Sequence, residues 1–326
     1  MQPSFFKNLG PFDNNKINSV VDCQSINVDD TDKFIDLVSI DKIKKNSLSF
    51  LYDDEIMPRN LPKDSCIICT KKKINELNSR QKVLLVKDVQ KAVAKLSNLF
   101  YRDLNDREIR KLKPPIMGEN CKIGNNVVIE NGVIIGDNVK IEHGAIIKHS
   151  CLIGNGSKIG SNVVISNSIL GESTYIGSNS SIGQRGFGFY IEQERNINIY
   201  HIGRVVIHSS SSIGSSCTID RGSFSDTTIG ENTYIDNLCH IAHNVEIGNN
   251  CAFAAMTGIA GSAKLGNYVL AGGQTGIAGH IRIGNNVKVA AKSGVFKNIN
   301  DGESVMGNPA IKTYQYLKNY KKIYGN

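Results

Sequence analysis

Aliphatic residues recur at every sixth position through most of the chain after residue 120. One uninterrupted run extends from Ile123 to Ile165, and a second extends from Ile229 to Val295. An α-helix rotates by about 600° over six residues, so this period gives a helix no constant apolar face. A single strand rarely exceeds about ten residues. A strict six-residue aliphatic repeat is typical of a parallel β-helix, so we predict a mainly-β fold.

A second ladder of short or β-branched side chains precedes the aliphatic one by two residues, as at Val133, Cys151 and Thr257. Positions i and i−2 of a strand face the same side, so both ladders are predicted to point inward. Gly or Asn follows many of the aliphatic residues, and both tolerate the positive φ that tight corners need. Three hexads make one triangular coil. The roughly twenty-six hexads predict eight to nine coils, each rising about 4.8 Å.

The first 113 residues lack this repeat. Short strands are predicted at 47–52, 66–70 and 83–86, and Asp88 is predicted to cap a helix with its apolar face at Val89, Val93, Leu96 and Phe100. We therefore predict a small α/β domain at 1–113, a β-helix at 114–302 and a basic helical extension at 303–326. Two segments, 184–201 and 220–228, interrupt the repeat, and solenoid loops often serve binding.

Composition narrows the class of protein. The 326 residues carry a net charge of +8, and no apolar run approaches the ~18 residues that cross a bilayer. The first residues lack a basic leader and a long apolar core, so they do not resemble a secretory signal. We expect a soluble, cytoplasmic protein.

The eight cysteines are predicted to be structural. Five occupy the small inward position of the repeat, where a thiol acts as a compact hydrophobe. Cys66 and Cys69 form a C-x-x-C, but two isoleucines lie between them and no second pair completes a zinc site. No metal site is predicted.

The last sixteen residues hold Lys312, Lys318, Lys321 and Lys322 and no acidic residue. They are predicted to form a basic helix. The stacking motifs of RNA-binding modules are missing, so nucleic acid is not the expected partner. An acidic protein fits better, because complementary charge steers encounter. The alternative is a solvated helix that only covers the end of the solenoid.

One histidine lies in a pattern that suggests chemistry. Gly261 follows His243 by eighteen residues, one full coil, and Gly279 follows by another, next to His280. These residues should line one edge of the prism. An imidazole can take a proton at neutral pH, and a bare amide can hydrogen-bond a developing oxyanion. These are the parts that acyl transfer requires, with Asp236 a candidate to orient the ring.

Several segments closely resemble the UDP-3-O-acylglucosamine N-acyltransferases, the family that performs the third step of lipid A assembly in lipopolysaccharide biosynthesis. The most specific are 218–222, 226–227, 235–237 and 241–248, which read TIDRG, DT, IDN and IAHNVEIG. The resemblance extends through the segments 186–189, 202–205, 279–280 and 307–310 and into the N-terminal domain at 48–51.

The resemblance implies a left-handed β-helix that assembles as a homotrimer with sites between neighbouring subunits. It implies transfer of a 3-hydroxyacyl group from acyl carrier protein, through its phosphopantetheine, to the 2-amino group of UDP-3-O-(3-hydroxyacyl)glucosamine. His243 matches the family's general base, Asp236 its neighbouring carboxylate and His280 its second histidine. Gly261 matches the position whose amide lies at the thioester carbonyl. No metal or further cofactor is implied.

The family's uracil-binding pattern, F-x-x-N-x-x-Y, is altered in this chain. Phe50 is retained, Asp53 replaces the amide donor and Ile56 replaces the second aromatic residue. Tyr52 is the candidate to stack on the base instead. Phe50 fits the core of a strand nearly as well as a nucleotide contact.

Three alternatives remain open at the level of sequence. An O-acyltransferase acting on UDP-N-acetylglucosamine shares the repeat but ordinarily lacks a domain like 1–113. A trimeric metal hydrase needs three histidines on zinc, whereas His240 and His243, three apart, point to opposite sides of a strand. A scaffold solenoid without activity leaves the two interruptions and the row at His243 unexplained.

Overall fold

The computed structural model describes residues 5–58, 60–193 and 195–324. The chain divides into two compact units. Of the described residues, the solenoid unit comprises Phe5, 105–187 and 203–324, and the N-terminal unit comprises 6–58, 60–104, 188–193 and 195–202. The domain boundary predicted at residue 113 therefore differs from the division at residue 104, and the segment 188–202 leaves the predicted β-helix.

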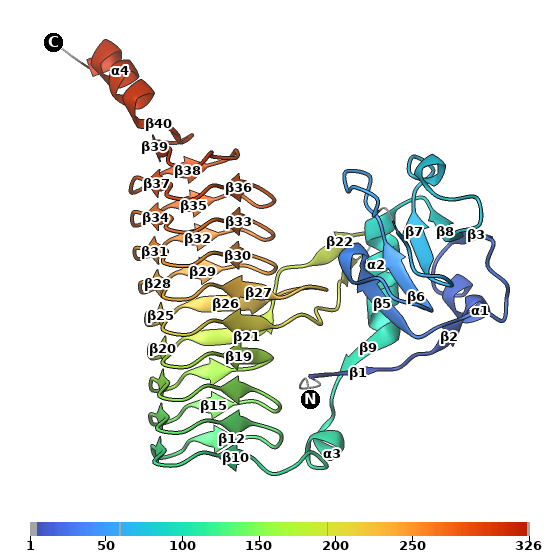
Figure 1. Cartoon of the computed structure of the whole chain (residues 1–326), viewed down its shortest axis with the longest axis horizontal. Coiled ribbons are helices and arrows are strands. Elements are labelled where there is room, and N and C mark those ends of the chain that lie inside the picture. Colours follow the sequence, from blue (N-terminus) through green and yellow to red (C-terminus); the bar gives the residue numbers. More distant parts are fainter. Residues whose placement is uncertain (1–4, 59, 194, 325–326) are drawn as a thin grey trace. The chain divides into compact units, whose positions relative to one another are not determined.

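The solenoid unit is a parallel β-helix of short strands stacked in three sheets (Figure 1). Sheet I contains β10 (Ile116–Met117), β13 (Ile134–Ile135), β16 (Leu152–Ile153), β19 (Ser168–Leu170), β24 (Val205–Ile207), β27 (Thr227–Ile229), β30 (Glu246–Ile247), β33 (Lys264–Leu265) and β36 (Arg282–Ile283). Sheet II contains β11 (Lys122–Ile123), β14 (Lys140–Ile141), β17 (Lys158–Ile159), β20 (Tyr175–Ile176), β25 (Ser212–Ile213), β28 (Tyr234–Ile235), β31 (Ala252–Phe253), β34 (Leu270–Ala271), β37 (Lys288–Val289), β39 (Ser304–Met306) and β40 (Ile311–Lys312). Sheet III contains β12 (Val128–Ile129), β15 (Ile146–Ile147), β18 (Val164–Ile165), β21 (Ser181–Arg185), β26 (Thr218–Arg221), β29 (His240–Ile241), β32 (Gly258–Ile259), β35 (Gly276–Ile277) and β38 (Gly294–Val295).

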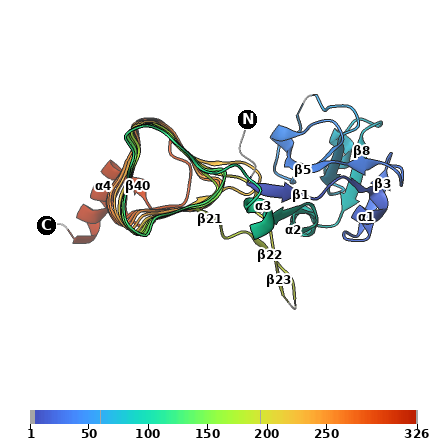
Figure 2. The same ribbon diagram turned by 90° about the horizontal axis from the view of Figure 1, so that it is seen from below.

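The strand register confirms the eighteen-residue coil. Ile135 pairs with Ile153, and Ile241 pairs with Ile259. Seen along the solenoid, the coils superpose as a triangle (Figure 2). Sheets I and III each hold nine strands, which fits the predicted eight to nine coils. The predicted mainly-β solenoid is confirmed.

Both predicted ladders point into the prism. Along them, Val133, Ile141, Cys217 and Val269 have no exposed surface. The first coil is the exception, because no further coil covers it, and Ile123 is 40% exposed. Stacked aliphatic side chains thus form one continuous core along the whole unit, which is where a solenoid gains its stability.

The glycines after the aliphatic residues serve a different purpose from the one predicted. Most have ordinary backbone angles, and the positive φ falls two residues later, as at Asn126 and Asn138. A Cβ at Gly124 would lie 2.6 Å from the backbone nitrogen of His143 in the next coil. These glycines are therefore required by the close approach of neighbouring coils, whereas the corners are turned mainly by asparagine and serine.

Residues 105–113 belong with the solenoid because they contact the corner of its first coil at 131–132. The short helix α3 (Asp106–Ile109) has a capping box between Asn105 and Glu108. Beyond it, Lys113 accepts a hydrogen bond from the amide of Gly132 at 2.7 Å. The segment 105–113 is thus helical only at Asp106–Ile109 and lies against one corner of the first coil.

The N-terminal unit is a five-stranded sheet with one main helix. The sheet has the order β3 (Cys23–Ile26), β8 (Lys82–Val86), β7 (Cys66–Cys69), β6 (Ser47–Phe50) and β5 (Asp36–Ser39), and only β3 is antiparallel to its neighbour. The smaller elements are β1 (Phe6–Asn8), β2 (Phe12–Asp13), α1 (Asn14–Asn18), β4 (Lys33–Phe34), the 3-10 turns at Ile40–Lys42 and Ile74–Glu76, and β9 (Tyr101–Asp103). The helix α2 (Val89–Phe100) begins as predicted, because the Asp88 side chain accepts a hydrogen bond from the amide of Lys91.

The longer interruption forms a hairpin on α2. Its strands are β22 (Phe189–Ile191) and β23 (Asn196–Asn198). The Asn98 amide nitrogen donates to the Asn198 carbonyl at 2.6 Å, and Lys91 pairs with Glu192. These contacts explain why 188–202 groups with the N-terminal unit.

The cysteines behave as small core residues. Cys66 and Cys69 are buried in β7, and burial raises the pKa of the Cys69 thiol to about 11. Cys151, Cys217 and Cys251 are buried inside the coils. No disulfide joins any of the described cysteines. Among the described residues, no helix is both long and apolar enough to span a membrane.

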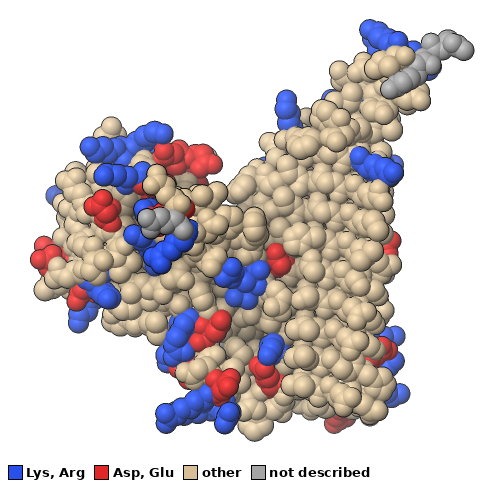
Figure 3. Space-filling view, turned by 180° about the vertical axis from the view of Figure 1, so that it is seen from behind, with Lys and Arg blue, Asp and Glu red and all other residues tan. Residues whose placement is uncertain are grey.

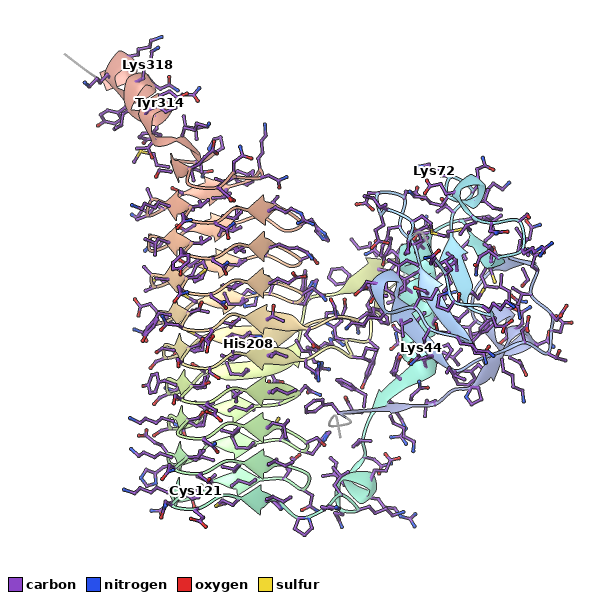
Figure 4. All side chains as sticks on the ribbon, in the orientation of Figure 1. Lys44, Lys72, Cys121, His208, Tyr314 and Lys318 are labelled. Atoms are coloured by element: carbon purple, nitrogen blue, oxygen red, sulfur yellow. The ribbon has the colours of Figure 1, made fainter. Side chains whose placement is uncertain are left out.

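The chain ends in the helix α4 (Thr313–Tyr324), which follows β40. Its start is tied to the solenoid by a salt bridge of 2.5 Å between Lys312 and Glu303. Tyr314 and Lys318 project from the helix (Figure 4), and basic side chains stand out around it on the surface (Figure 3). The predicted basic C-terminal helix is therefore present.

Candidate functional site

His243, Gly261 and His280 lie on one edge of the solenoid, at the corner that follows sheet III. The amide of Ser262 donates to the His243 carbonyl at 3.0 Å, and the amide of His280 donates to the Gly261 carbonyl at 3.1 Å. A Cβ added at Gly261 would lie 2.7 Å from Cε1 and 2.9 Å from Nε2 of His243. The imidazole therefore lies directly against the bare backbone of Gly261, as the eighteen-residue spacing predicts.

The amide of Gly261 is available to a ligand. Within the described part of the chain it donates no hydrogen bond, although the amides on either side of the corner are used in the stack. Gly279 continues the row, since a Cβ there would lie 2.7 Å from the Gly261 carbonyl oxygen. A base and an unused backbone donor thus share one corner.

Two further polar groups surround His243. Its Nδ1 lies 3.0 Å from Oδ1 of Asn244. Burial raises the pKa of the Asp220 carboxyl, while the nearby His240 and His243 act in the opposite direction. Nε2 of His240 lies 3.9 Å from the Asp220 carboxylate, and its Nδ1 lies 2.7 Å from the Thr218 hydroxyl. Hexad counting misses Asp220 and Asn244 as neighbours of the imidazole, although both lie within the segments that carry the family resemblance.

Asp236, the carboxylate assigned to orient His243, lies elsewhere in the chain's own fold. It follows β28 in sheet II, whereas His243 follows β29 in sheet III. Asp236 lines a cavity of about 660 Å³ with Tyr234, Leu270 and other residues of sheet II. Seven residues correspond to more than one side of the triangle, so a single chain does not place this carboxylate beside the imidazole.

The shorter interruption, 220–228, forms a loop directly below His243. The Arg204 guanidinium and the Asp226 carboxylate form a bidentate ion pair that closes the loop, with nitrogen–oxygen distances of 2.6 and 3.1 Å. The side chain of Arg221 is buried and donates to the Gly183 carbonyl at 3.2 Å. The loop is therefore fixed to the coil rather than free on the surface.

A bare stripe runs along sheet III from His240. The outward positions of the next three strands are Gly258, Gly276 and Gly294. A Cβ at Gly258 or Gly276 would meet nothing within 4 Å, whereas one at Gly294 would lie 2.7 Å from Oδ1 of Asn308. The stripe is open at its start and is closed at its far end.

The predicted uracil-binding residues lie at the end of β6 in the N-terminal unit. Phe50 is buried, and its ring contacts that of Tyr52 edge-on at 5.6 Å. Asp53 is held by the Thr70 hydroxyl at 2.6 Å and by Lys72, and the Thr70 hydrogen bond lowers its carboxyl pKa. Ile56 is 90% exposed. Of these residues, Tyr52 has the partly exposed ring.

No metal site is built into the described residues. They contain no group of three or more histidine, cysteine, aspartate or glutamate side chains placed to hold an ion. The zinc arrangement of the metal-hydrase alternative therefore has no set of ligands within one described chain.

Two family models match separate parts of the repeat region. The model of the GMPPB C-terminal domain matches residues 112–195, and the six-repeat bacterial transferase hexapeptide model matches residues 226–261. The second match contains both His243 and Gly261. The solenoid is a hexapeptide-repeat structure.

The chain is also similar to curated relatives over a short segment. The chain is 51% identical over 73 residues to a UDP-3-O-acylglucosamine N-acyltransferase of Caulobacter vibrioides, and 49% identical over 73 residues to one of Maricaulis maris. Each alignment covers 22% of this chain, and it covers 22% and 21% of the two relatives. The match thus spans about a fifth of the relatives' length.

Solved structures support the fold over a longer range. The UDP-N-acetylglucosamine acyltransferase of Campylobacter jejuni superposes with a TM-score of 0.54 at 28% identity. That superposition covers 62% of this chain and 78% of the other. The hexapeptide acyltransferases are therefore similar to this chain in both sequence and fold.

Proposed function

We propose that this protein is an acyl carrier protein-dependent UDP-3-O-acylglucosamine N-acyltransferase of lipid A biosynthesis. The observation that carries the proposal is the contact between the His243 ring and Gly261, whose amide has no acceptor among the described residues. The relatives named for this activity support the choice of reaction.

In the proposed reaction, the 2-amino nitrogen of the sugar attacks the carbonyl carbon of the acyl thioester. His243 takes the proton that the amine loses, while the Gly261 amide donates to the oxygen that becomes negative. The tetrahedral intermediate collapses as the C–S bond breaks. The acyl group remains on the sugar as an amide, and the released sulfur of the carrier takes up a proton. His280, on the same edge, is proposed to contact the substrate.

We propose a homotrimer with its sites between subunits. Sheet II carries exposed apolar side chains on one face, with Tyr234 at 55%, Tyr175 at 45% and Leu270 at 43% exposure. Contiguous apolar surface of this kind marks an interface in many proteins. A neighbouring subunit packed there would bring its own His243 edge toward Asp236, which supplies the carboxylate that a single chain does not place beside the imidazole.

The donor and acceptor would bind through different parts of the chain. The basic helix α4 fits an acidic carrier protein by charge. In the N-terminal unit, Tyr52 is the proposed stacking partner of uracil, with Phe50 supporting its ring at 5.6 Å. Asp53 is less suited to contact the base, because Thr70 and Lys72 already engage its carboxylate. The cytoplasmic location stays a prediction.

The O-acyltransferase is the second candidate, because the Campylobacter jejuni structure with the same solenoid is a UDP-N-acetylglucosamine acyltransferase. The two are separated by offering the purified protein UDP-N-acetylglucosamine and UDP-3-O-acylglucosamine, each with 3-hydroxyacyl carrier protein. We expect an N-acylated product from the second sugar only, identified by mass spectrometry. Acylation of UDP-N-acetylglucosamine alone would overturn the proposal.

His243→Ala tests the base in the same assay. Loss of general-base assistance is expected to lower kcat by about 10²–10⁴-fold. His208→Ala is the control, since that histidine lies outside the row. Retention of more than about a tenth of the wild-type kcat, where base assistance contributes at least about 10²-fold, contradicts the role of His243.

A further inference from the structure

The side chain of Asn244 is held at both ends by the 220–228 loop. Its Oδ1 accepts hydrogen bonds from the backbone amide of Ser223 at 3.0 Å and from the Ser223 hydroxyl at 2.9 Å. Its Nδ2 donates to the Ser225 carbonyl at 3.3 Å and to the Ser225 hydroxyl at 2.7 Å. The backbone amide of Asn244 donates to the Thr227 hydroxyl at 2.8 Å.

These partners fix which end of the amide is oxygen. A backbone N–H can only donate and a backbone carbonyl can only accept, so the two ends of the Asn244 side chain cannot exchange. Oδ1 must face Ser223, and Nδ2 must face Ser225. The usual ambiguity of an asparagine flip is absent at this position.

The fixed oxygen lies beside the imidazole. Nδ1 of His243 is 3.0 Å from Oδ1 of Asn244. An amide oxygen has no proton to give, so a hydrogen bond at this distance requires the proton to be on Nδ1. The neutral ring then carries its lone pair on Nε2, the atom that lies against Gly261.

We infer that Asn244 is a positioning residue that holds His243 in the Nδ1–H tautomer and leaves Nε2 as the base. The consequence for turnover rests on the proposed acyltransferase function, whereas the tautomer does not. The inference also gives the 220–228 interruption a purpose. The loop holds the amide in place, and the Arg204–Asp226 pair holds the loop.

The neutral amide has a specific chemical effect. It orients the ring without adding a negative charge, whereas a carboxylate would also stabilise the protonated imidazole and raise its pKa. Asn244→Asp therefore keeps the acceptor at Oδ1 and is expected to shift the acidic limb of the kcat/KM profile to higher pH. Asn244→Ala removes the acceptor altogether.

The test is nitrogen-15 NMR of histidine-labelled full-length protein above the titration of the ring, with the His243 signals assigned by His243→Gln. We expect Nδ1 protonated and Nε2 unprotonated in the wild type. In Asn244→Ala we expect a shift toward the Nε2–H form. We also expect kcat to fall about 10- to 100-fold with little change in KM, as for other groups that orient an imidazole.

Asn286→Ala is the matched control. Asn244 and Asn286 have left-handed φ values of 61° and 56°, so both substitutions carry the same backbone strain. The side chain of Asn286 is exposed and makes no hydrogen bond to any described residue. This variant is expected to match the wild type in tautomer and turnover.

Two results would overturn the inference. One is a dominant Nε2–H form in the wild type. The other is a wild-type tautomer ratio and kcat in Asn244→Ala. If no sugar is acylated while the Nδ1–H form is found, the proposed function fails and the assignment of Asn244 stands.

Discussion

At the scale of the residue, the site depends on one missing side chain. The His243 ring occupies the volume that a Cβ at residue 261 would fill, and the donor offered to a ligand there is the Gly261 backbone amide. In the proposed reaction, side chain and backbone act on the same reacting group from adjacent coils. Substitution at Gly261 is therefore a sharper test of the proposed geometry than removal of the imidazole.

Gly261→Ala is expected to displace the imidazole, because the new methyl would lie 2.7 Å from Cε1 of His243. We expect kcat to fall by at least about 10²-fold, because the displaced imidazole no longer assists as a base, with the melting temperature nearly unchanged. Steady-state kinetics and circular dichroism measure the two.

The control for this variant is Gly273→Ala. Gly273 occupies the same place in its hexad on another edge of the prism, and a Cβ there would approach only the Ala255 carbonyl, at 3.2 Å. If both variants keep wild-type turnover, His243 and Gly261 do not act together.

At the scale of the element, the bare stripe of sheet III offers room for an acyl chain, and the helix α4 offers positive charge. The outward glycines of β32, β35 and β38 leave bare backbone beside the His240 strand, and Asn308 limits the far end. This stripe has room for an extended acyl chain without displacement of any side chain. The helix carries three lysines after Tyr316 and no acidic residue.

Gly276→Leu tests whether the bare stripe holds the acyl chain. A Cβ at this position meets nothing within 4 Å, so the fold should tolerate the substitution. We expect kcat/KM for a long 3-hydroxyacyl carrier protein to fall by about tenfold, equivalent to about 1.4 kcal/mol, while a short acyl donor is used as before. Equal loss with donors of every length would show that the stripe does not hold the chain.

Replacing Lys318, Lys321 and Lys322 with glutamate tests the helix. We expect KM for the acyl carrier protein to rise by about tenfold at low salt and to approach the wild-type value as salt screens the charges. The KM for the sugar should stay constant. A rise in both constants, or no dependence on ionic strength, contradicts docking through α4.

At the scale of the whole molecule, the proposed site is complete only when chains assemble. Asp236 and His243 lie at corners of different sheets within one chain. The apolar face of sheet II beside Asp236 is the surface that assembly would cover.

Complementation between subunits measures this arrangement. His243→Ala and Asp236→Ala are each expected to be nearly inactive. When the two are unfolded and refolded together, random assembly in a cyclic trimer should restore about a quarter of the wild-type sites. Each restored site would take His243 from one chain and Asp236 from its neighbour.

Light scattering gives the oligomeric state of the mixture. A mixture that forms trimers but recovers no activity places both residues in one subunit or removes Asp236 from the site. A monomer in solution contradicts the proposed assembly as a whole.

The repeat decides the solenoid from local sequence alone. Each hexad specifies one strand and one corner, so Ile241 and Ile259 fall into register by counting, and His243 meets Gly261 for the same reason. The cap of α2 at Asp88 is local as well. Only the tertiary structure decides where the segments that interrupt the six-residue repeat are placed. The 220–228 loop turns Asn244 toward His243, the 188–202 hairpin packs on α2, and Asp236 lies on another sheet. Periodicity places residues that are whole coils apart, whereas the positions of loops depend on side-chain hydrogen bonds that no spacing encodes.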